Sequence, residues 1–247
     1  MRDEESYIEG RNPVTEALRS GKTIERLFVL DNCYDGPIRS IVRDGKKLGI
    51  RIDFVPKSRL DEMSVQRGHQ GVIAYIAAHE YASVEDIMAR AAEKGEPPFI
   101  IFLDQIEDPH NLGAIIRTAN VVGAHGVVIP KNRAAGITAT VAKASAGAVN
   151  YTPVARVANL SQTIENLKKE GMWFVCADMG GDEMYNVDMT GSIGLVIGNE
   201  GSGVSPSVRK HCDLVAAIPM KGDIDSLNAS VSCGILCYEA LRQRRGK

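Results

Sequence analysis

The chain has 247 residues, enough for two modest domains that each bury a core of their own. A hydrophobic content of 44% with only 5% aromatic residues is typical of an ordinary globular protein, and it excludes a disordered chain. Lys and Arg number 29 against 31 Asp and Glu, so the net charge of -2 excludes a strongly basic nucleic-acid binder. Any contact with nucleic acid must therefore use a local basic patch.

Cysteine usage and hydropathy exclude further classes of protein. The five cysteines are scattered without a C-x-x-C pair, which predicts reduced thiols rather than a disulfide framework or a zinc site. The chain starts with charged residues, and no apolar run approaches the roughly 18 residues of a membrane helix. We therefore expect no signal peptide, no membrane span and a cytoplasmic protein.

Residues 1–78 predict a small domain of alternating helices and strands. A first helix is expected to begin at Asn12-Pro13, because Asn caps helices and Pro suits the first turn, and to end at Gly21. Strands are predicted over the apolar runs 27–30, 50–55 and 71–77, and a second helix over 37–48.

This first unit carries several basic residues that are expected to be exposed, namely Arg39, Arg43, Lys46, Lys47 and Arg51. The acidic residues Asp35 and Asp44 lie beside them in the sequence. A solvated helix face and a contact with RNA therefore both stay open as interpretations of this charge pattern.

Residues 79–98 predict a connection with a short helix, because Ser83-Val-Glu-Asp86 fits a capping box and Gly95 ends the pattern. A second domain is expected over 99–247. Its strands are predicted over 99–104, 126–130, 172–178, 193–198 and 213–219, as continuous apolar runs that imply a parallel sheet covered on both faces. Helices are predicted between them over 111–123, 137–147, 160–170, 205–211 and 226–244.

The segment from Asn111 to Asn120 follows the strand that ends at Asp104. Asn111 is placed to cap the next helix, and capping alone would explain it. Arg117 lies among small and apolar residues of the same helix, where a guanidinium needs an acidic or phosphate partner.

A second polar segment begins at Gly198, directly after a predicted strand, at the end where open α/β sheets place ligands. Gly198, Gly201 and Gly203 permit close approach of the backbone to a ligand. Glu200 between them is either a solvated turn residue or part of a site, and it is a natural partner for Arg117.

A third segment runs from Ile218 across a loop into the last predicted helix. Ser226 is expected to cap that helix, with Asn228 close to its start.

Two nucleotide-binding motifs are excluded. The glycines after position 197 reverse the spacing of the dinucleotide fingerprint G-x-G-x-x-G, and Glu16 stands where a phosphate loop ending at residues 21–23 requires glycine.

In this order and spacing, the three segments resemble the signature motifs of the SpoU (TrmH-like) RNA ribose 2'-O-methyltransferases of the SPOUT class. Residues 7–14 resemble the start of that family's substrate-binding domain, which is similar to ribosomal protein L30e. The chain is most similar to the two-domain type that methylates a guanosine ribose in 23S ribosomal RNA. The resemblance implies an L30e-like α/β domain over 1–78 and a parallel-sheet methyltransferase domain with a trefoil knot over 99–247.

The resemblance also implies the site residues. S-adenosylmethionine would bind through backbone groups at Gly198, Ile218 and Leu227, and no metal would be required. The positions that match the polar active-site residues of the family are Asn111, Arg117, Glu200, Ser226 and Asn228. The family acts as a homodimer in which one subunit can contribute to the site of the other.

Each of these residues has an expected role. Arg117 would orient the RNA phosphate and stabilise charge on the ribose oxygen, because a guanidinium does not readily lose its proton. The family proposal that the matching Arg activates the hydroxyl stays open beside this one. Glu200 would hold Arg117, while Asn111 and Asn228 position the ribose. Ser226 would fix the loop.

Three alternatives stay open for the function. The first is a transfer RNA substrate in place of ribosomal RNA, since that choice depends on family analogy. The second is a catalytically silent RNA-binding paralogue, which would bind RNA without transferring a methyl group. The third is a doubly wound oxidoreductase, which would prefer a nicotinamide cofactor to S-adenosylmethionine.

Overall fold

The computed structural model describes residues 7–20, 22–33, 35–64, 68–77, 79–223 and 226–245. Contacts between residues divide the chain into two compact units. The first unit runs to Glu80 and includes residues 136–139, and the second unit contains the remainder from Tyr81 onward. Each unit has its own sheet and its own apolar core.

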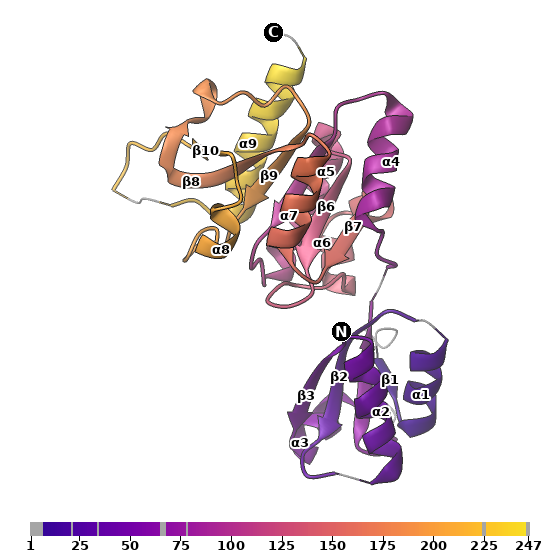
Figure 1. The fold of residues 1–247 in the computed structure, drawn as a ribbon. Helices are drawn as coiled ribbons and strands as arrows, with labels where there is room; N and C mark the ends of the chain where they lie inside the picture. Colours follow the sequence, from indigo (N-terminus) through magenta and orange to yellow (C-terminus); the bar gives the residue numbers. More distant parts are fainter. Residues whose placement is uncertain are drawn as a thin grey trace. The chain divides into compact units, whose positions relative to one another are not determined.

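The first unit is a mixed four-stranded sheet with helices packed on it (Figure 1). The strand order is β1-β4-β2-β3, in which β4 pairs antiparallel with β1 and β2, and β2 pairs parallel with β3. Along the chain these elements are β1 (Tyr7–Glu9), α1 (Arg11–Arg19), β2 (Ile24–Leu30), α2 (Gly36–Lys47), β3 (Arg51–Val55), α3 (Lys57–Met63) and β4 (Val72–Ile76).

The helices α1 and α2 of this unit begin with different kinds of cap. Asp35 caps α2, because its Oδ1 accepts a hydrogen bond of 3.1 Å from the Ile38 amide, and this bond lowers the pKa of the Asp35 carboxyl. The expected cap of α1 is wrong. Gly10 stands at the cap position with a φ of 95°, so the chain already turns there and Asn12 lies inside the helix. Gly21, the expected end of α1, lies outside the described residues.

The second unit is built on a six-stranded sheet in which every neighbouring pair of strands is parallel, which confirms the expectation from its continuous apolar runs. The strand order is β10-β8-β9-β5-β6-β7. These strands are β5 (Phe99–Leu103), β6 (Gly126–Pro130), β7 (Val154–Val157), β8 (Trp173–Glu183), β9 (Ile193–Ile197) and β10 (Leu214–Ala217). Only β7, with four residues, was not predicted.

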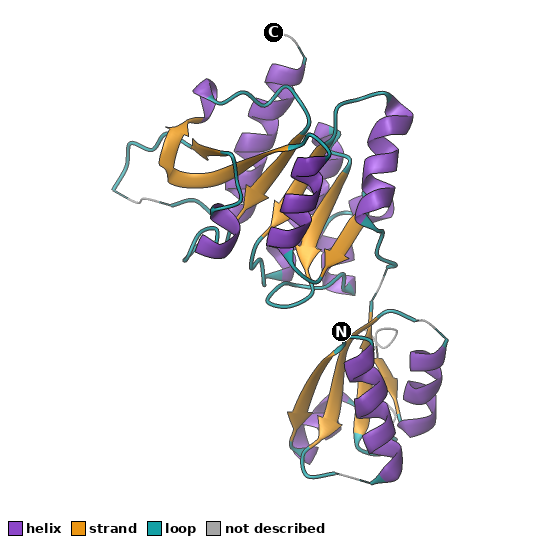
Figure 2. Ribbon diagram, in the orientation of Figure 1, coloured by secondary structure: helices purple, strands orange, loops and turns teal. Residues whose placement is uncertain are grey.

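Helices lie on both faces of this sheet (Figure 2). They are α4 (Val84–Lys94), α5 (Pro109–Val122), α6 (Ala139–Ala144), α7 (Leu160–Lys169), α8 (Pro206–Arg209) and α9 (Ala229–Arg244), with single 3-10 turns at 148–150 and 184–186. Helices α4, α7 and α8 contribute to one apolar cluster with the sheet, whereas α5 packs against α9. No helix in the described ranges is long and apolar enough to span a bilayer.

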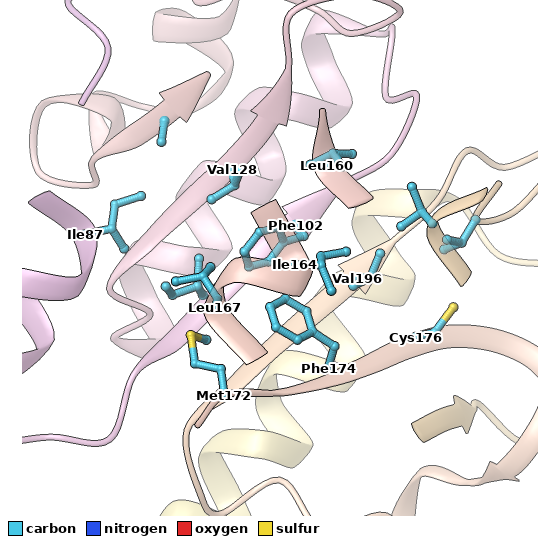
Figure 3. Close-up of a cluster of buried hydrophobic side chains, with 14 residues drawn as sticks. Ile87, Phe102, Val128, Leu160, Ile164, Leu167, Met172, Phe174, Cys176 and Val196 are labelled. Atoms are coloured by element: carbon cyan, nitrogen blue, oxygen red, sulfur yellow. The ribbon is translucent and has the colours of Figure 1, made fainter. Parts of the chain in front are cut away.

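The apolar cluster of the second unit surrounds Phe102 of β5 (Figure 3). Phe102 packs edge-on against Phe174 of β8, with ring centroids 5.1 Å apart and planes at 71°. Ile87 of α4 and Ile164 of α7 close the cluster. Because side chains alternate along a strand, the equally buried Leu103 points to the opposite face of the sheet. Both faces of β5 are therefore covered.

Helix α4 lies in the segment expected to be a connection, and it packs as part of the second unit. The predicted capping box is confirmed, because Ser83 Oγ accepts from the Asp86 amide at 3.0 Å and Asp86 Oδ2 accepts from the Ser83 amide at 2.8 Å. Gly95 in a left-handed conformation ends the helix, as expected. With Ile87 in the core, residues 81–98 are not a free linker.

Candidate active site

The three polar segments meet at the edge of the sheet where β5, β9 and β10 reach their carboxyl ends. Strand β5 ends just before Asp104, β9 just before Gly198, and β10 just before Ile218. In a parallel sheet these ends share one edge, which is where open α/β sheets bind ligands.

A hydrogen-bonded node joins one residue from each segment. Glu200 Oε1 accepts from Nδ2 of Asn111, from Nδ2 of Asn228 at 3.2 Å and from the Ala229 amide at 3.3 Å. Asn228 Nδ2 also donates to Asn111 Oδ1 at 3.0 Å. Glu200 is thereby held in contact with Asn111, which is 89 positions away in the sequence, and with Asn228, which is 28 positions away. We call Asn111, Glu200 and Asn228 the polar node.

Both asparagines of the node lie at the start of a helix. The caps expected for these two helices, Asn111 and Ser226, are wrong. Asp108 caps α5, since its Oδ1 accepts from the His110 amide at 2.8 Å, and Asn111 lies buried in the first turn. Pro109 explains the difference, because a proline without an N–H suits the first helical position and places the cap one residue before it.

Asn228 caps α9 in place of Ser226. Its Oδ1 accepts from the amide of Ser230 at 2.9 Å and from the Ser230 hydroxyl at 2.6 Å. The Asn228 side chain therefore uses its oxygen for the helix and its amide nitrogen for the node. Ser226 is exposed and makes no hydrogen bond with another described residue, so its expected part in fixing the loop stays a prediction.

The loop after β9 folds tightly back on itself. The backbones of Asn199 and Gly203 exchange two hydrogen bonds, of 2.8 and 3.2 Å, and Asn199 Oδ1 accepts from the Gly201 amide at 2.8 Å. A side chain at Gly198 would overlap with the backbone of Gly203 and Val204. Glycine is therefore required at position 198 by close approach of two backbone segments.

Asp104 holds this loop from the neighbouring strand, a role that was not predicted. It is buried at the end of β5, and its Oδ2 accepts from the Ser205 amide at 2.8 Å. An acidic residue that ends an otherwise apolar strand is the sequence signal for such a role.

A cavity of about 320 Å³ lies beside the loop, within the range of small-ligand sites. Gly198, Ile218 and Leu227, the expected cofactor-binding residues, all line it. Glu200 and Ser226 line it as well, so the polar node borders the cavity. The remaining wall combines the glycine loop with residues from β8, β10 and the start of α9.

The wall contributed by β8 was not predicted. Residues 177–181 bulge out of the pairing with β10, because Cys176 pairs with Val215 and Asp182 pairs with Ala216, the next residue. Asp178 and Met179 in this bulge line the cavity. The paired glycines 180 and 181 within an apolar strand were the available signal for a bulge.

Arg117 differs from its expected position. Its side chain is exposed on α5, six positions after Asn111, and it makes no ion pair or hydrogen bond with any residue in the described ranges. The carboxylate of Glu200 is turned to the polar node instead. Six positions is more than one and a half helical turns, so Asn111 and Arg117 point to different sides of the helix. The expected pair of Glu200 with Arg117 is therefore absent within this chain.

Comparison with known proteins assigns the family. Residues 98–238 match the family model described as SpoU rRNA Methylase family, and residues 7–82 match the model described as RNA 2'-O ribose methyltransferase substrate binding. The chain belongs to the SpoU methylase family. Within that family, it is 47% identical to a protein of Bacillus subtilis (strain 168), named as the TrmH family tRNA/rRNA methyltransferase YacO, over 99% of this chain and 98% of that one.

Solved structures of SpoU methyltransferases share this architecture. AviRb from Streptomyces viridochromogenes, in complex with the cofactor AdoMet, is 25% identical with a TM-score of 0.62, over 98% of this chain and 91% of that one. A TrmH/SpoU tRNA modifying enzyme from A. aeolicus is 32% identical with a TM-score of 0.56, over 66% of this chain and 84% of that one. The α/β fold and the N-terminal substrate-binding domain expected for a SpoU methylase are confirmed.

Proposed function

We propose that this RNA methyltransferase transfers a methyl group from S-adenosylmethionine to the ribose 2'-hydroxyl of a nucleotide in structured RNA, a guanosine of 23S ribosomal RNA. The observation that carries the proposal is the polar node at the border of a cavity lined by Gly198, Ile218 and Leu227. The trefoil knot is part of the same proposal, and the likeness to SpoU methyltransferase structures supports it.

The cavity fits the proposed cofactor. Backbone groups of the glycine loop are accessible in its wall, where they can read the edges of an adenine, and Ile218, Leu227 and Met179 supply apolar contacts. When bound, S-adenosylmethionine supplies an already activated methyl group. In the described residues no group of three or more His, Cys, Asp and Glu is arranged to hold a metal ion, and the proposed reaction uses none.

The polar node acts by positioning. One oxygen of Glu200 accepts three hydrogen bonds, and these bonds fix both asparagines. Asn111 and Asn228 would then position the ribose indirectly, because their amide groups are used within the node and fix the three segments that border the cavity. Alignment of the 2'-hydroxyl with the methyl group is the step that this arrangement favours.

Arg117 belongs to the same site through a second copy of the chain. Helices α5 and α9 pack together and leave Val121, Val231 and Tyr238 exposed, at 62%, 47% and 55%. Arg117 lies four positions before Val121, on the same face of α5. A homodimer that buries this apolar face would carry Arg117 toward the site of the partner, where it orients the RNA phosphate and stabilises charge on the ribose oxygen.

The proposed reaction is tested by the position of the methyl group. Purified protein is incubated with S-adenosylmethionine and RNA from cells that lack it, and the RNA is digested to nucleosides. We expect 2'-O-methylguanosine, and mapping of its position distinguishes ribosomal from transfer RNA. Methyl groups on bases, with the riboses unmodified, would refute the reaction.

A further inference from the structure

The first unit has a hollow of about 640 Å³ between α2 and the edge strand β3. Its lining consists of Cys33, Ile38, Arg39, Val42, Arg43, Lys46, Lys47 and Phe54. Four of these residues are cations, and no acidic residue is among the described residues that line it. The net charge of the whole chain is -2, so this concentration of positive charge is a local feature of the hollow.

The cations come from one face of α2. Arg39 and Arg43 are four positions apart, and Lys46 and Lys47 follow one turn later, so all four project to the same side. Arg43 shares its charge with Asp44 at 3.1 Å. Arg39, Lys46 and Lys47 make no ion pair within the described part of the chain. Three cations therefore remain available to a negatively charged ligand.

An exposed aromatic ring lies among these cations. Phe54 is 47% exposed although it belongs to a strand. Ile52, two residues earlier on β3, lies beneath Gly45 of α2, so Phe54 projects from the same face of the strand toward the helix. An aromatic face bordered by cations suits an unstacked base and its flanking phosphates.

We infer that this hollow holds an unpaired nucleotide of the RNA substrate, with its base stacked on Phe54 and its phosphates beside Arg39, Lys46 and Lys47. The inference rests on the proposed function for the identity of the ligand as RNA. RNA fits better than a protein ligand, because every charged side chain that lines the hollow is a cation, and phosphates supply the matching charge.

The first test measures binding of the full chain to a labelled RNA hairpin with an unpaired loop and to a fully paired duplex of the same length. We expect Phe54→Leu to weaken hairpin binding at least about fivefold with little effect on the duplex, and Phe54→Tyr to restore it. Lys46→Gln combined with Lys47→Gln should weaken binding and lower the salt slope by roughly 1.4 to 1.8, the value for two neutralised phosphates.

A matched control changes two exposed lysines that lie outside the hollow and make no ion pair within the described residues, Lys22→Gln and Lys57→Gln. This control removes the same charge and should bind the hairpin more tightly than the double variant of α2. Equal effects of the two double variants, or unchanged binding by Phe54→Leu, would overturn the inference.

The second test locates the contact. A hairpin with 4-thiouridine in its loop is crosslinked to the wild-type protein, and the protein is digested with trypsin. We expect the crosslinked peptide to span residues 52–57, since trypsin cleaves after Arg51 and Lys57. Crosslinks confined to other peptides would contradict the inference. Failure of the proposed function looks different, because the wild type would then bind and crosslink normally yet leave every ribose unmethylated.

Discussion

At the scale of single residues, Glu200 and Arg117 have different surroundings. Glu200 is fixed by the polar node, whereas Arg117 is exposed and unpaired within the described residues. A guanidinium that is held by no carboxylate of its own chain keeps its full charge for a phosphate. Under the proposed function, Glu200 is one of the positioning groups and Arg117 is the charge-stabilising group.

Arg117→Ala is expected to lower the rate of methyl transfer at least ~10²-fold, the effect of losing one preorganised charge-stabilising group. Affinity for S-adenosylmethionine should stay nearly unchanged, because Arg117 does not line the cavity. Single-turnover rates and calorimetric titration measure the two effects.

Arg117→Lys should restore little activity, since an ammonium cannot reproduce the planar fork of a guanidinium. Lys169→Ala, which removes an exposed cation from α7, is the control and should behave as wild type. Near-normal turnover in either Arg117 variant would remove this residue from the catalytic set.

At the scale of elements, the loop after β9 and the bulge of β8 shape the cavity. Both depend on glycine at points of backbone approach, since a side chain at Gly181 would overlap with the Val215 carbonyl, as one at Gly198 would with Gly203. The apolar strands supply a rigid frame, and the glycines let the β9 loop fold tightly on itself and the β8 bulge lie close to β10.

Gly198→Ala is expected to weaken binding of S-adenosylmethionine at least about tenfold, because overpacking of this size costs about 1–3 kcal/mol and the loop must open to accept a methyl group. The matched control is Gly191→Ala, since a side chain at position 191 meets nothing within 4 Å. Calorimetric titration of both variants checks the result. Equal affinities would show that the loop adapts without cost.

A buried histidine just before β6 links the start of β5 to the segment that follows α4, at the amino ends of these strands. His125 Nδ1 accepts from the Phe99 amide at 3.0 Å, and Nε2 contacts Glu96 Oε2 at 3.1 Å. Burial, together with the charge of Lys94, lowers the pKa of His125 below its usual 6.5. The neutral ring is required, because a protonated ring could not accept from Phe99.

We therefore expect acidification below about pH 6.5 to destabilise the protein. In the unfolded chain His125 binds a proton at its ordinary pKa, whereas in the folded protein its pKa is lower. The stability that neutral His125 contributes is therefore fully present above the ordinary pKa and is lost as the pH falls toward the lowered pKa. Thermal unfolding between about pH 7.5 and 5.5 should show a steeper loss in the wild type than in His125→Gln. The exposed His110→Gln should follow the wild type.

At the scale of the whole molecule, the strands of the second unit were largely predictable, because strands buried on both faces leave continuous apolar runs. The three site segments were predictable from their residues, and the structure does bring Asn111, Glu200 and Asn228 into contact. Their catalytic role stays a prediction.

Other features were beyond local sequence. The caps at Asp108 and Asn228 depend on which of several polar residues meets the first free amides, and the exposed position of Arg117 depends on the rotation of α5 against the sheet. The hollow beside Phe54 depends on the packing of α2 over β3. Such features are set by tertiary packing rather than by propensity.

A truncated protein that begins at Ala82 is expected to fold, dimerise and bind S-adenosylmethionine. The capping box of α4 and the core around Ile87 stay intact in it. It should bind RNA more weakly than the full chain, with a salt slope that is shallower by roughly 0.7 to 0.9 for each phosphate that the first unit neutralises. Titrations with RNA at several salt concentrations measure both effects. Equal affinity and equal slopes would show that the first unit does not hold RNA.

Under the proposed function, the polar node also determines when during synthesis the enzyme can first work. Two of its members, Asn111 and Glu200, are translated before Asn228, which caps the last described helix. A ribosome that has not yet released α9 therefore carries a nascent chain whose Glu200 lacks two of its three donors. Under the proposed function, a chain whose α9 is still inside the ribosome cannot modify the ribosomal RNA of that particle.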